Sequence, residues 1–147
     1  MNKSDHFQKL EWMYLHAAPI NEFYKPSITI DEGKAVIEID SHKKYFHAAH
    51  AVHGSVYFKM LDDAAFFAVN SVVKDAFVLT TNFNINLLRP VIFGKLRAEG
   101  ELVFDAKKTF VAEAKLYNND DKLIATGSGT FVKSNIELNE DVGYKEY

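Results

Sequence analysis

The sequence predicts an α+β fold in which a curved antiparallel sheet wraps around one long central helix. Three observations support this prediction. Residues 56–73 are apolar on almost every side of a helix, and such a helix is buried in a core. Two short strand patterns precede it and four follow it, separated by turn sequences. Residues 4–17 carry one apolar face and predict a short N-terminal helix.

Composition limits the class of protein. The chain has 147 residues, 48% hydrophobic and 25% charged, which suits one domain over 1–147. A net charge of −3 with dispersed Lys and Arg gives no reason to expect a nucleic-acid partner. The absence of cysteine excludes disulfides, a Cys nucleophile and Cys metal sites. A polar N-terminus and the lack of an apolar run of about 18 residues predict a cytoplasmic protein that does not span a membrane.

The expected elements follow one another with short connections. Ser4 is a candidate cap for the first helix, and Ala18-Pro19 ends it. The C-terminal residues 135–147 are polar and acidic, so we expect a frayed tail there. Strands are expected at 27–30, 34–39, 77–89, 94–104, 109–117 and 122–133.

The strand at 77–89 has the clearest alternation. Its odd-numbered residues are mostly apolar and are expected to pack on the buried helix. Its even-numbered residues would then face away from the core. Three Asn residues in alternation fit a solvated sheet face, but Asn is disfavoured in strands, so a cleft lining or a polar subunit interface is the alternative. The even set is Val78, Thr80, Asn82, Asn84, Asn86 and Leu88.

The start of the buried helix is a candidate binding element. Ser55 is a plausible N-cap. Gly54 has no side chain to block the approach of another group to its N–H. The free N–H groups of the first turn and the helix dipole together make a small positive pole.

Two carboxylates lie in the middle of this apolar helix. Asp63 has Lys59 four residues before it, so an ion pair is available. Asp62 has no neighbour on the helix that could neutralise it. Asp is rarely buried without a partner, so Asp62 is the candidate functional carboxylate, with a pKa raised by desolvation.

Four histidines lie just before the helix, at positions 42, 47, 50 and 53. Zinc sites use His, but they need further ligands on a defined scaffold, and this segment holds no carboxylate. We therefore expect a loop that lines a cleft, in which one or two imidazoles serve as polar groups, and no metal site.

Three stretches resemble the hotdog-fold thioesterases, in particular the PaaI-type acyl-CoA thioesterases. His53-Gly54, with Asp62 further on, is similar to the first signature of that family. Residues 80–90, ending in Arg89-Pro90, are similar to the second, and residues 125–131 to the closing strand. The resemblance covers about residues 25–133 and implies a hotdog fold that hydrolyses acyl or aryl thioesters without a cofactor.

The resemblance also implies roles for single residues. Asp62 is expected to activate water or to attack directly, and the Gly54 N–H to polarise the carbonyl group. Thr80 falls on the position of the water-holding hydroxyl, with Thr81 as a possible substitute. His47 stands where the family commonly has Asn, so its role as a polarising group is a departure from the pattern. The first signature of the family has a second Gly after the His-Gly pair, and in this sequence Ser55 replaces it.

Asp62 lies eight residues beyond Gly54, or about 12 Å along one helix. One subunit therefore cannot easily bring both residues to one carbonyl. Family members solve this by dimerising, which implies a homodimer, or a dimer of dimers.

Substrate contacts are expected from His53, Ser55, Thr81, Asn82 and Arg89. The phosphates of CoA would need cations near the cleft, and Arg89, Lys95 and Arg97 are candidates.

Two other functions fit parts of the same pattern. A hotdog hydratase or dehydratase would pair an acid with a histidine, and His47 or His53 could serve. A non-catalytic acyl-CoA-binding hotdog protein would need neither. The strand motif and the closing-strand motif favour the thioesterase.

Overall fold

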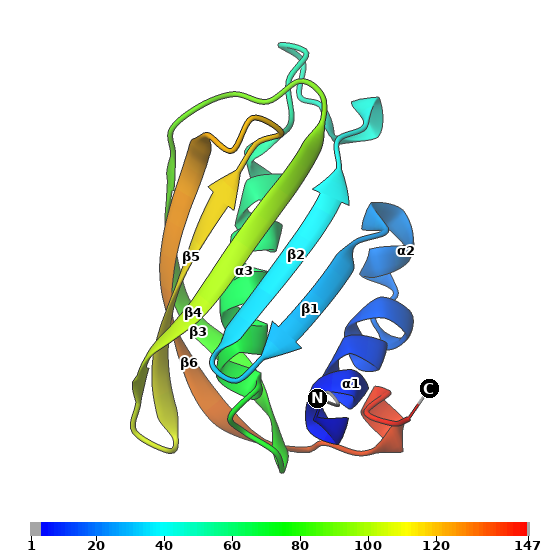
Figure 1. The fold of residues 1–147 in the computed structure, drawn as a ribbon, viewed down its shortest axis with the longest axis vertical. Helices are drawn as coiled ribbons and strands as arrows, with labels where there is room; N and C mark the ends of the chain where they lie inside the picture. Colours follow the sequence, from blue (N-terminus) through cyan, green and yellow to red (C-terminus); the bar gives the residue numbers. More distant parts are fainter. Residues whose placement is uncertain (1–3, 147) are drawn as a thin grey trace.

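The computed structural model describes residues 4–146 and contains a six-stranded antiparallel sheet curved around one long helix. The strand order is β1-β2-β4-β5-β6-β3. This is the predicted hotdog architecture, and Figure 1 shows α3 lying along the sheet, with α1 and α2 beside β1. The strands are β1 (Ser27–Asp31), β2 (Lys34–Asp40), β3 (Ala76–Leu87), β4 (Lys95–Asp105), β5 (Thr109–Tyr117) and β6 (Leu123–Glu137).

The central helix α3 (Gly54–Asn70) forms the core. Met60, Leu61, Ala64 and Ala65 are completely buried on it, as the apolar composition of the stretch predicts. The helix contacts every strand of the sheet. Gly100 allows β4 to approach the helix backbone closely, because a Cβ at this position would overlap the carbonyl oxygen of Ala64.

A β-bulge in β3 changes which residues face the helix. Thr80 pairs with Phe131 and Asn82 with Thr130, so Thr81 is an extra residue in the strand. Just before the bulge Val78 and Thr80 are more buried than Leu79, whereas after it Phe83 and Ile85 are more buried than the Asn residues beside them. The prediction that the odd-numbered residues pack on the helix along the whole strand is therefore wrong. Leu79, which is 42% exposed, shows the error.

The N-terminal segment is helical over the predicted range, but its details differ. Helix α1 (Asp5–Trp12) continues as a π-helical turn, η1 (Met13–Ala17). Ser4 is the N-cap residue of α1, as predicted, but its side chain makes no capping hydrogen bond. A further short helix, α2 (Ile20–Tyr24), follows Pro19 and was not predicted.

The two edges of the sheet are treated differently. On β1, the backbone N–H of Ile30 donates to Glu11 of α1 at 2.8 Å, so α1 covers this edge. At the opposite end of the sheet lies β3, and within residues 4–146 no strand pairs with its outer edge. A long unpaired edge is a template for pairing with another chain.

The C-terminal segment is ordered rather than frayed, so that prediction is wrong for residues 135–146. Strand β6 runs to Glu137, and Leu138 beyond it is buried. A 3₁₀ turn, η3 (Glu140–Val142), follows. Tyr144 then lies with its hydroxyl 2.6 Å from Nδ1 of His6 on α1. Apolar residues and this polar contact hold the segment against the N-terminal helix.

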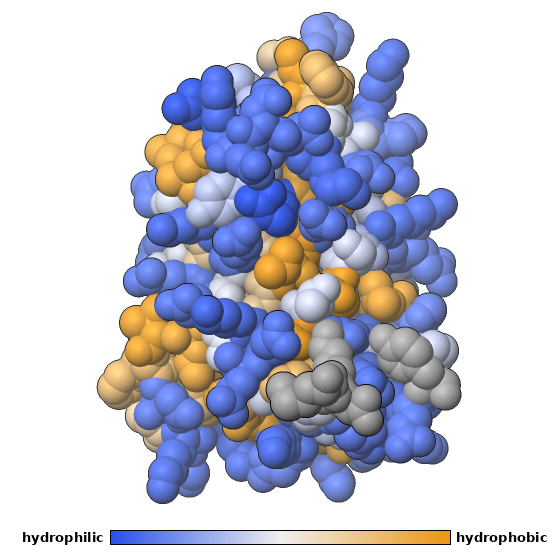
Figure 2. Space-filling model, in the orientation of Figure 1, coloured by the Kyte–Doolittle hydropathy of each residue, from blue (hydrophilic) through white to orange (hydrophobic). Residues whose placement is uncertain are grey.

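The surface of the face shown in Figure 2 is mostly hydrophilic, with separate apolar patches. Among the described residues, no helix combines the length and the apolar character that a membrane span requires.

The close contact between Gly100 and α3 generates a stability prediction. Gly100→Ala is expected to lower the free energy of unfolding by at least about 2 kcal/mol, because the added methyl group must displace the helix backbone. Chemical denaturation measures this change. Glu101→Ala, at the exposed neighbouring position, should change it by less than about 0.5 kcal/mol. Equal effects of the two substitutions would contradict the packing argument.

Candidate active site

Asp62 and Thr80 meet where α3 faces β3. The hydroxyl of Thr80 donates to Oδ1 of Asp62 at 2.9 Å. The bulge explains this contact, since it places Thr80 on the inward side of β3 instead of the outward side that plain alternation predicts. Thr81 does not substitute for it, because its hydroxyl donates to the carbonyl of Thr130 at 3.1 Å.

Burial raises the pKa of Asp62 to about 6. Desolvation is the largest cause, and the neighbouring Asp63 charge acts in the same direction. The hydrogen bond from Thr80 and the charge of Lys59 lower the pKa and only partly offset this effect. A carboxylate with such a pKa is ionised near neutral pH and is a stronger base than an exposed one.

The adjacent carboxylate has a different environment. Lys59 Nζ lies 2.5 Å from Oδ2 of Asp63, which confirms the predicted ion pair. The hydroxyl of Tyr14, from η1, donates to the same oxygen at 2.7 Å. Asp63 is therefore neutralised and held, whereas Asp62 receives one neutral hydroxyl donor.

Both carboxylates line a cavity of about 440 Å³ between α3, β3 and the N-terminal segment. Thr80 and Phe77 line it from β3, and residues 13–21 contribute a wall. Sequence reasoning found Asp62 and Thr80 but missed Tyr14. No sequence signal places η1 against the centre of α3, because that contact arises from docking of separate elements.

The start of α3 has a different cap from the one predicted. Nδ1 of His53 accepts from the backbone N–H of Ser55 at 3.0 Å and also lies 2.8 Å from the Ser55 hydroxyl oxygen. His53 is thus the N-cap, and the assignment of Ser55 is wrong. An imidazole can accept in this way because its unprotonated nitrogen has a free lone pair. Within residues 4–146, no hydrogen bond is found for the N–H of Gly54.

Gly54, His47 and Arg89 border a second, shallower cavity of about 300 Å³. His47 is exposed, and its Nδ1 accepts from the N–H of Ala49 at 3.0 Å. Arg89 donates from Nε to the carbonyl of Leu123 at 3.2 Å. Asp62 is not among the residues that line this cavity. The predicted site residues therefore fall into two groups on one chain.

The other residues predicted to contact the substrate lie outside these two cavities. Asn82 is exposed on β3, where its Oδ1 accepts from the side chain of Asn84 at 3.0 Å. His53 and Ser55 border a third depression, on the α2 side of the start of α3. Neither Asn82 nor Thr81 lines either of the first two cavities.

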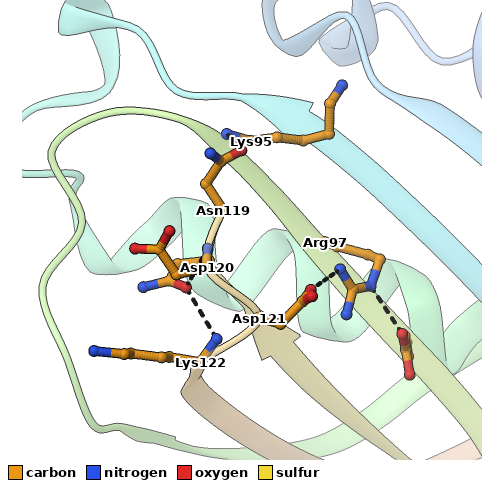
Figure 3. A network of polar contacts seen from close by, with 8 residues as sticks. Lys95, Arg97, Asn119, Asp120, Asp121 and Lys122 are labelled. Carbon is orange, nitrogen blue, oxygen red and sulfur yellow. Dashed lines mark hydrogen bonds and ion pairs between the residues drawn. The ribbon is translucent and has the colours of Figure 1, made fainter.

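Two candidate phosphate-binding cations are already paired. Figure 3 shows Arg97 between two carboxylates, with Nε 2.8 Å from Glu99 and Nη1 2.8 Å from Asp121. Lys95 lies 3.3 Å from Asp40. Arg89 has no such ion pair within the described part of the chain, and of the three it is the one beside Gly54.

The histidine segment does not form a metal site in the described structure. The rings of His47 and His53 are 6.5 Å apart between centroids. No group of three or more His, Cys, Asp or Glu side chains within residues 4–146 is arranged to hold a metal ion.

Solved structures share this fold. The PaaI protein of Escherichia coli, from the phenylacetic acid degradation operon, matches with a TM-score of 0.83 and 23% identity over 92% of this chain and 97% of that chain. A Mycobacterium tuberculosis protein named provisionally as an esterase matches with a TM-score of 0.75 and 18% identity, over 80% and 97% of the two chains. At these identities the likeness establishes the hotdog fold.

Sequence relatives agree with the structural matches. A protein of Archaeoglobus fulgidus, named provisionally as an esterase, is 32% identical over 109 residues, which are 74% of this chain and 70% of that protein. A second such protein, from Saccharolobus solfataricus, is 24% identical over 86% of this chain and 91% of its own length. Residues 49–125 match the family described as Thioesterase superfamily. These matches and the fold together show that the chain belongs to the thioesterase superfamily.

Proposed function

We propose that the protein is an acyl-CoA thioesterase that works as a homodimer and uses Asp62 as its general base. The observation that carries this proposal is the half-buried Asp62, with its raised pKa and its bond from Thr80, on the wall of an apolar cavity. Family membership supports hydrolysis of a thioester. The PaaI protein comes from a phenylacetic acid degradation operon, so aryl-CoA esters are sensible first substrates.

The reaction needs a base and a donor to the carbonyl oxygen. Ionised Asp62 removes a proton from a water molecule, which forms a bond to the thioester carbon. The tetrahedral intermediate then collapses, the carbon–sulfur bond breaks, and the proton passes to the CoA thiolate. Thr80 holds one carboxylate oxygen, which leaves the other for the water. The products are the free acid and CoA.

The Gly54 N–H is the proposed donor to the carbonyl oxygen. It lies at the positive end of α3 and has no hydrogen-bond partner within residues 4–146. His47 and Arg89 border the same cavity, so we assign His47 to orienting the carbonyl or the water and Arg89 to a CoA phosphate. His53 and Ser55 set the geometry of this helix start through their mutual hydrogen bonds.

A homodimer brings the two groups together. Gly54 is about 12 Å from Asp62 along one helix, and the two residues line different cavities. The uncovered edge of β3 offers the surface for a second copy. Exposed Phe58 and Leu79, at 40% and 42%, lie on the two elements that meet there. Antiparallel pairing about a two-fold axis would set Gly54 of one copy toward Asp62 of the other.

Family membership favours this proposal over a hydratase or dehydratase. That chemistry would use His47 or His53 together with an acid, whereas the matching family is described as Thioesterase superfamily and the relatives are named provisionally as esterases. A cytoplasmic location follows from the use of CoA thioesters and belongs to the same proposal.

The role of Asp62 can be tested through stability and activity together. The folded-state pKa lies above the usual 3.8, so the ionised carboxylate destabilises the fold above about pH 6. Asp62→Asn is expected to raise the free energy of unfolding by about 1–2 kcal/mol at pH 8 and by much less below pH 4. It should also reduce kcat at least about 100-fold. Asp120→Asn, at an exposed turn position, is the control and should do neither.

The bond between Thr80 and Asp62 generates a prediction about pH dependence. The base must be ionised, so kcat should rise as pH increases through about 6. Thr80→Val keeps the shape but removes the hydroxyl that stabilises the charged form. The midpoint of the pH–rate profile should therefore move upward. A profile with an unchanged midpoint would mean that the hydroxyl does not act on the base.

The shared site can be tested by mixing two inactive chains. Gly54→Pro removes the N–H, and the first helical position tolerates Pro; His53 already has an extended ψ of 143. Dimers of one Gly54→Pro chain and one Asp62→Asn chain keep one intact site. Co-expression and random pairing should restore roughly a quarter of the wild-type activity per dimer. If each site lay within one chain, the mixture would stay inactive.

A further inference from the structure

We propose that the ion pair of Lys59 and Asp63 makes the cavity selective for neutral apolar acyl groups and excludes acyl groups that end in a carboxylate. This inference rests on the proposed thioesterase function, because it assigns the cavity behind Asp62 to the acyl group. It concerns two residues that the proposed reaction itself does not use.

The walls of the cavity are aromatic. The rings of Phe66 and Phe77 are 5.2 Å apart between centroids, and those of Phe66 and Phe67 are 4.9 Å apart. Tyr14 meets Phe67 edge-on at 5.0 Å. These rings lie beyond Asp62 on α3 and across from it on β3 and η1. A thioester whose carbonyl lies at Asp62 would thus place its acyl chain among apolar side chains.

The cavity is lined by few charged side chains, and the cation among them is already paired. Among the described residues that line it, three are charged: Lys59, Asp62 and Asp63. Lys59 is the one cation in that set, and its side chain is 12% exposed. Its ammonium lies 2.5 Å from Asp63 and over the rings of Tyr14 and Tyr24, at 5.3 and 5.2 Å from their centroids. The ammonium of Lys59 is therefore already paired inside the protein and is not available to pair with a substrate.

Tyr14 completes this arrangement from the N-terminal segment. Burial and the negative charge of Asp63 raise the pKa of the Tyr14 hydroxyl far above its usual value. The hydroxyl accordingly remains a donor to Asp63 at every working pH. Because Asp63 receives both the ammonium and the hydroxyl, it also ties the wall formed by residues 13–21 to α3.

The consequence concerns the far end of the acyl group. A terminal carboxylate in this cavity would lose its hydration, would face Asp62 and Asp63, and would find no unpaired cation. An unpaired charge in such a place is strongly disfavoured. A methyl end of the same length meets no such penalty. Neutralising Asp63 would free Lys59 to pair with the substrate instead.

Hexanoyl-CoA and adipoyl-CoA test this inference, because their chains have the same length and differ at the end group. For the wild-type protein we expect kcat/KM to favour hexanoyl-CoA by about 100-fold or more. Asp63→Asn should reduce that preference at least about tenfold, since Lys59 can then pair with the adipoyl carboxylate. The ratio cancels any effect of the substitution on Asp62 that both substrates share.

Tyr14→Phe is the matched control. It removes the hydroxyl but leaves the ion pair and the ring, so the preference should stay within about threefold of the wild-type ratio. Circular dichroism and thermal unfolding check that each variant is folded. If Asp63→Asn does not fold, the wild-type protein alone tests the inference. Equal kcat/KM values for hexanoyl-CoA and adipoyl-CoA would overturn it.

Binding separates this inference from the proposed function. S-hexyl-CoA and S-(5-carboxypentyl)-CoA are thioethers that cannot be hydrolysed, and calorimetry gives their Kd values. If wild-type protein hydrolyses no thioester but prefers S-hexyl-CoA, and Asp63→Asn narrows that preference, the proposed function fails and the selectivity stands. If the protein hydrolyses thioesters but Asp63→Asn leaves the ratio of kcat/KM for hexanoyl-CoA to that for adipoyl-CoA unchanged, the selectivity inference fails and the proposed function stands.

Discussion

The packing of α3 against the concave face of the sheet is the contact on which the rest of the structure depends. The helix buries Met60, Leu61, Ala64 and Ala65 completely, and the glycine at position 100 lets its backbone touch β4. This close approach fixes the height and rotation of the helix above the sheet. Asp62 can then point only toward β3 and the N-terminal segment, where the cavity lies.

Two adjacent carboxylates on this helix acquire opposite characters from their neighbours. Successive residues on a helix point about 100° apart, so Asp63 reaches Lys59 and Tyr14, while Asp62 reaches β3. Asp63 receives two donors, one of them charged, and is a structural group. Asp62 is desolvated with one hydroxyl partner and keeps a pKa near neutrality. Environment rather than residue type separates the candidate base from its neighbour.

The two edges of the sheet differ, because α1 covers the β1 edge while no strand pairs with the outer edge of β3 within the described residues, and this difference bears on how a second subunit could complete the site. Glu11 of α1 satisfies a backbone group on the β1 edge, whereas β3 ends the sheet on the other side. The same strand supplies Thr80 and borders the helix that carries Gly54 and Asp62. An interface built on this edge would lie at the proposed site, so assembly and catalysis would depend on the same strand.

The sequence by itself determined the central helix and the positions of the six described strands. It also pointed to the two candidate groups of the site, the carboxylate of Asp62 and the N–H of Gly54. Apolar residues on every side of residues 56–73 and the alternation in the strands are local patterns, and the spacing of Lys59 and Asp63 gives their ion pair directly. The tertiary structure alone decided the contact between Tyr14 and Asp63, the folded C-terminal segment and the bulge that turns Thr80 inward. Each of these arises where separate elements dock or where two strands adjust their register. No run of neighbouring residues encodes that adjustment, because it is set by the fit of distant surfaces.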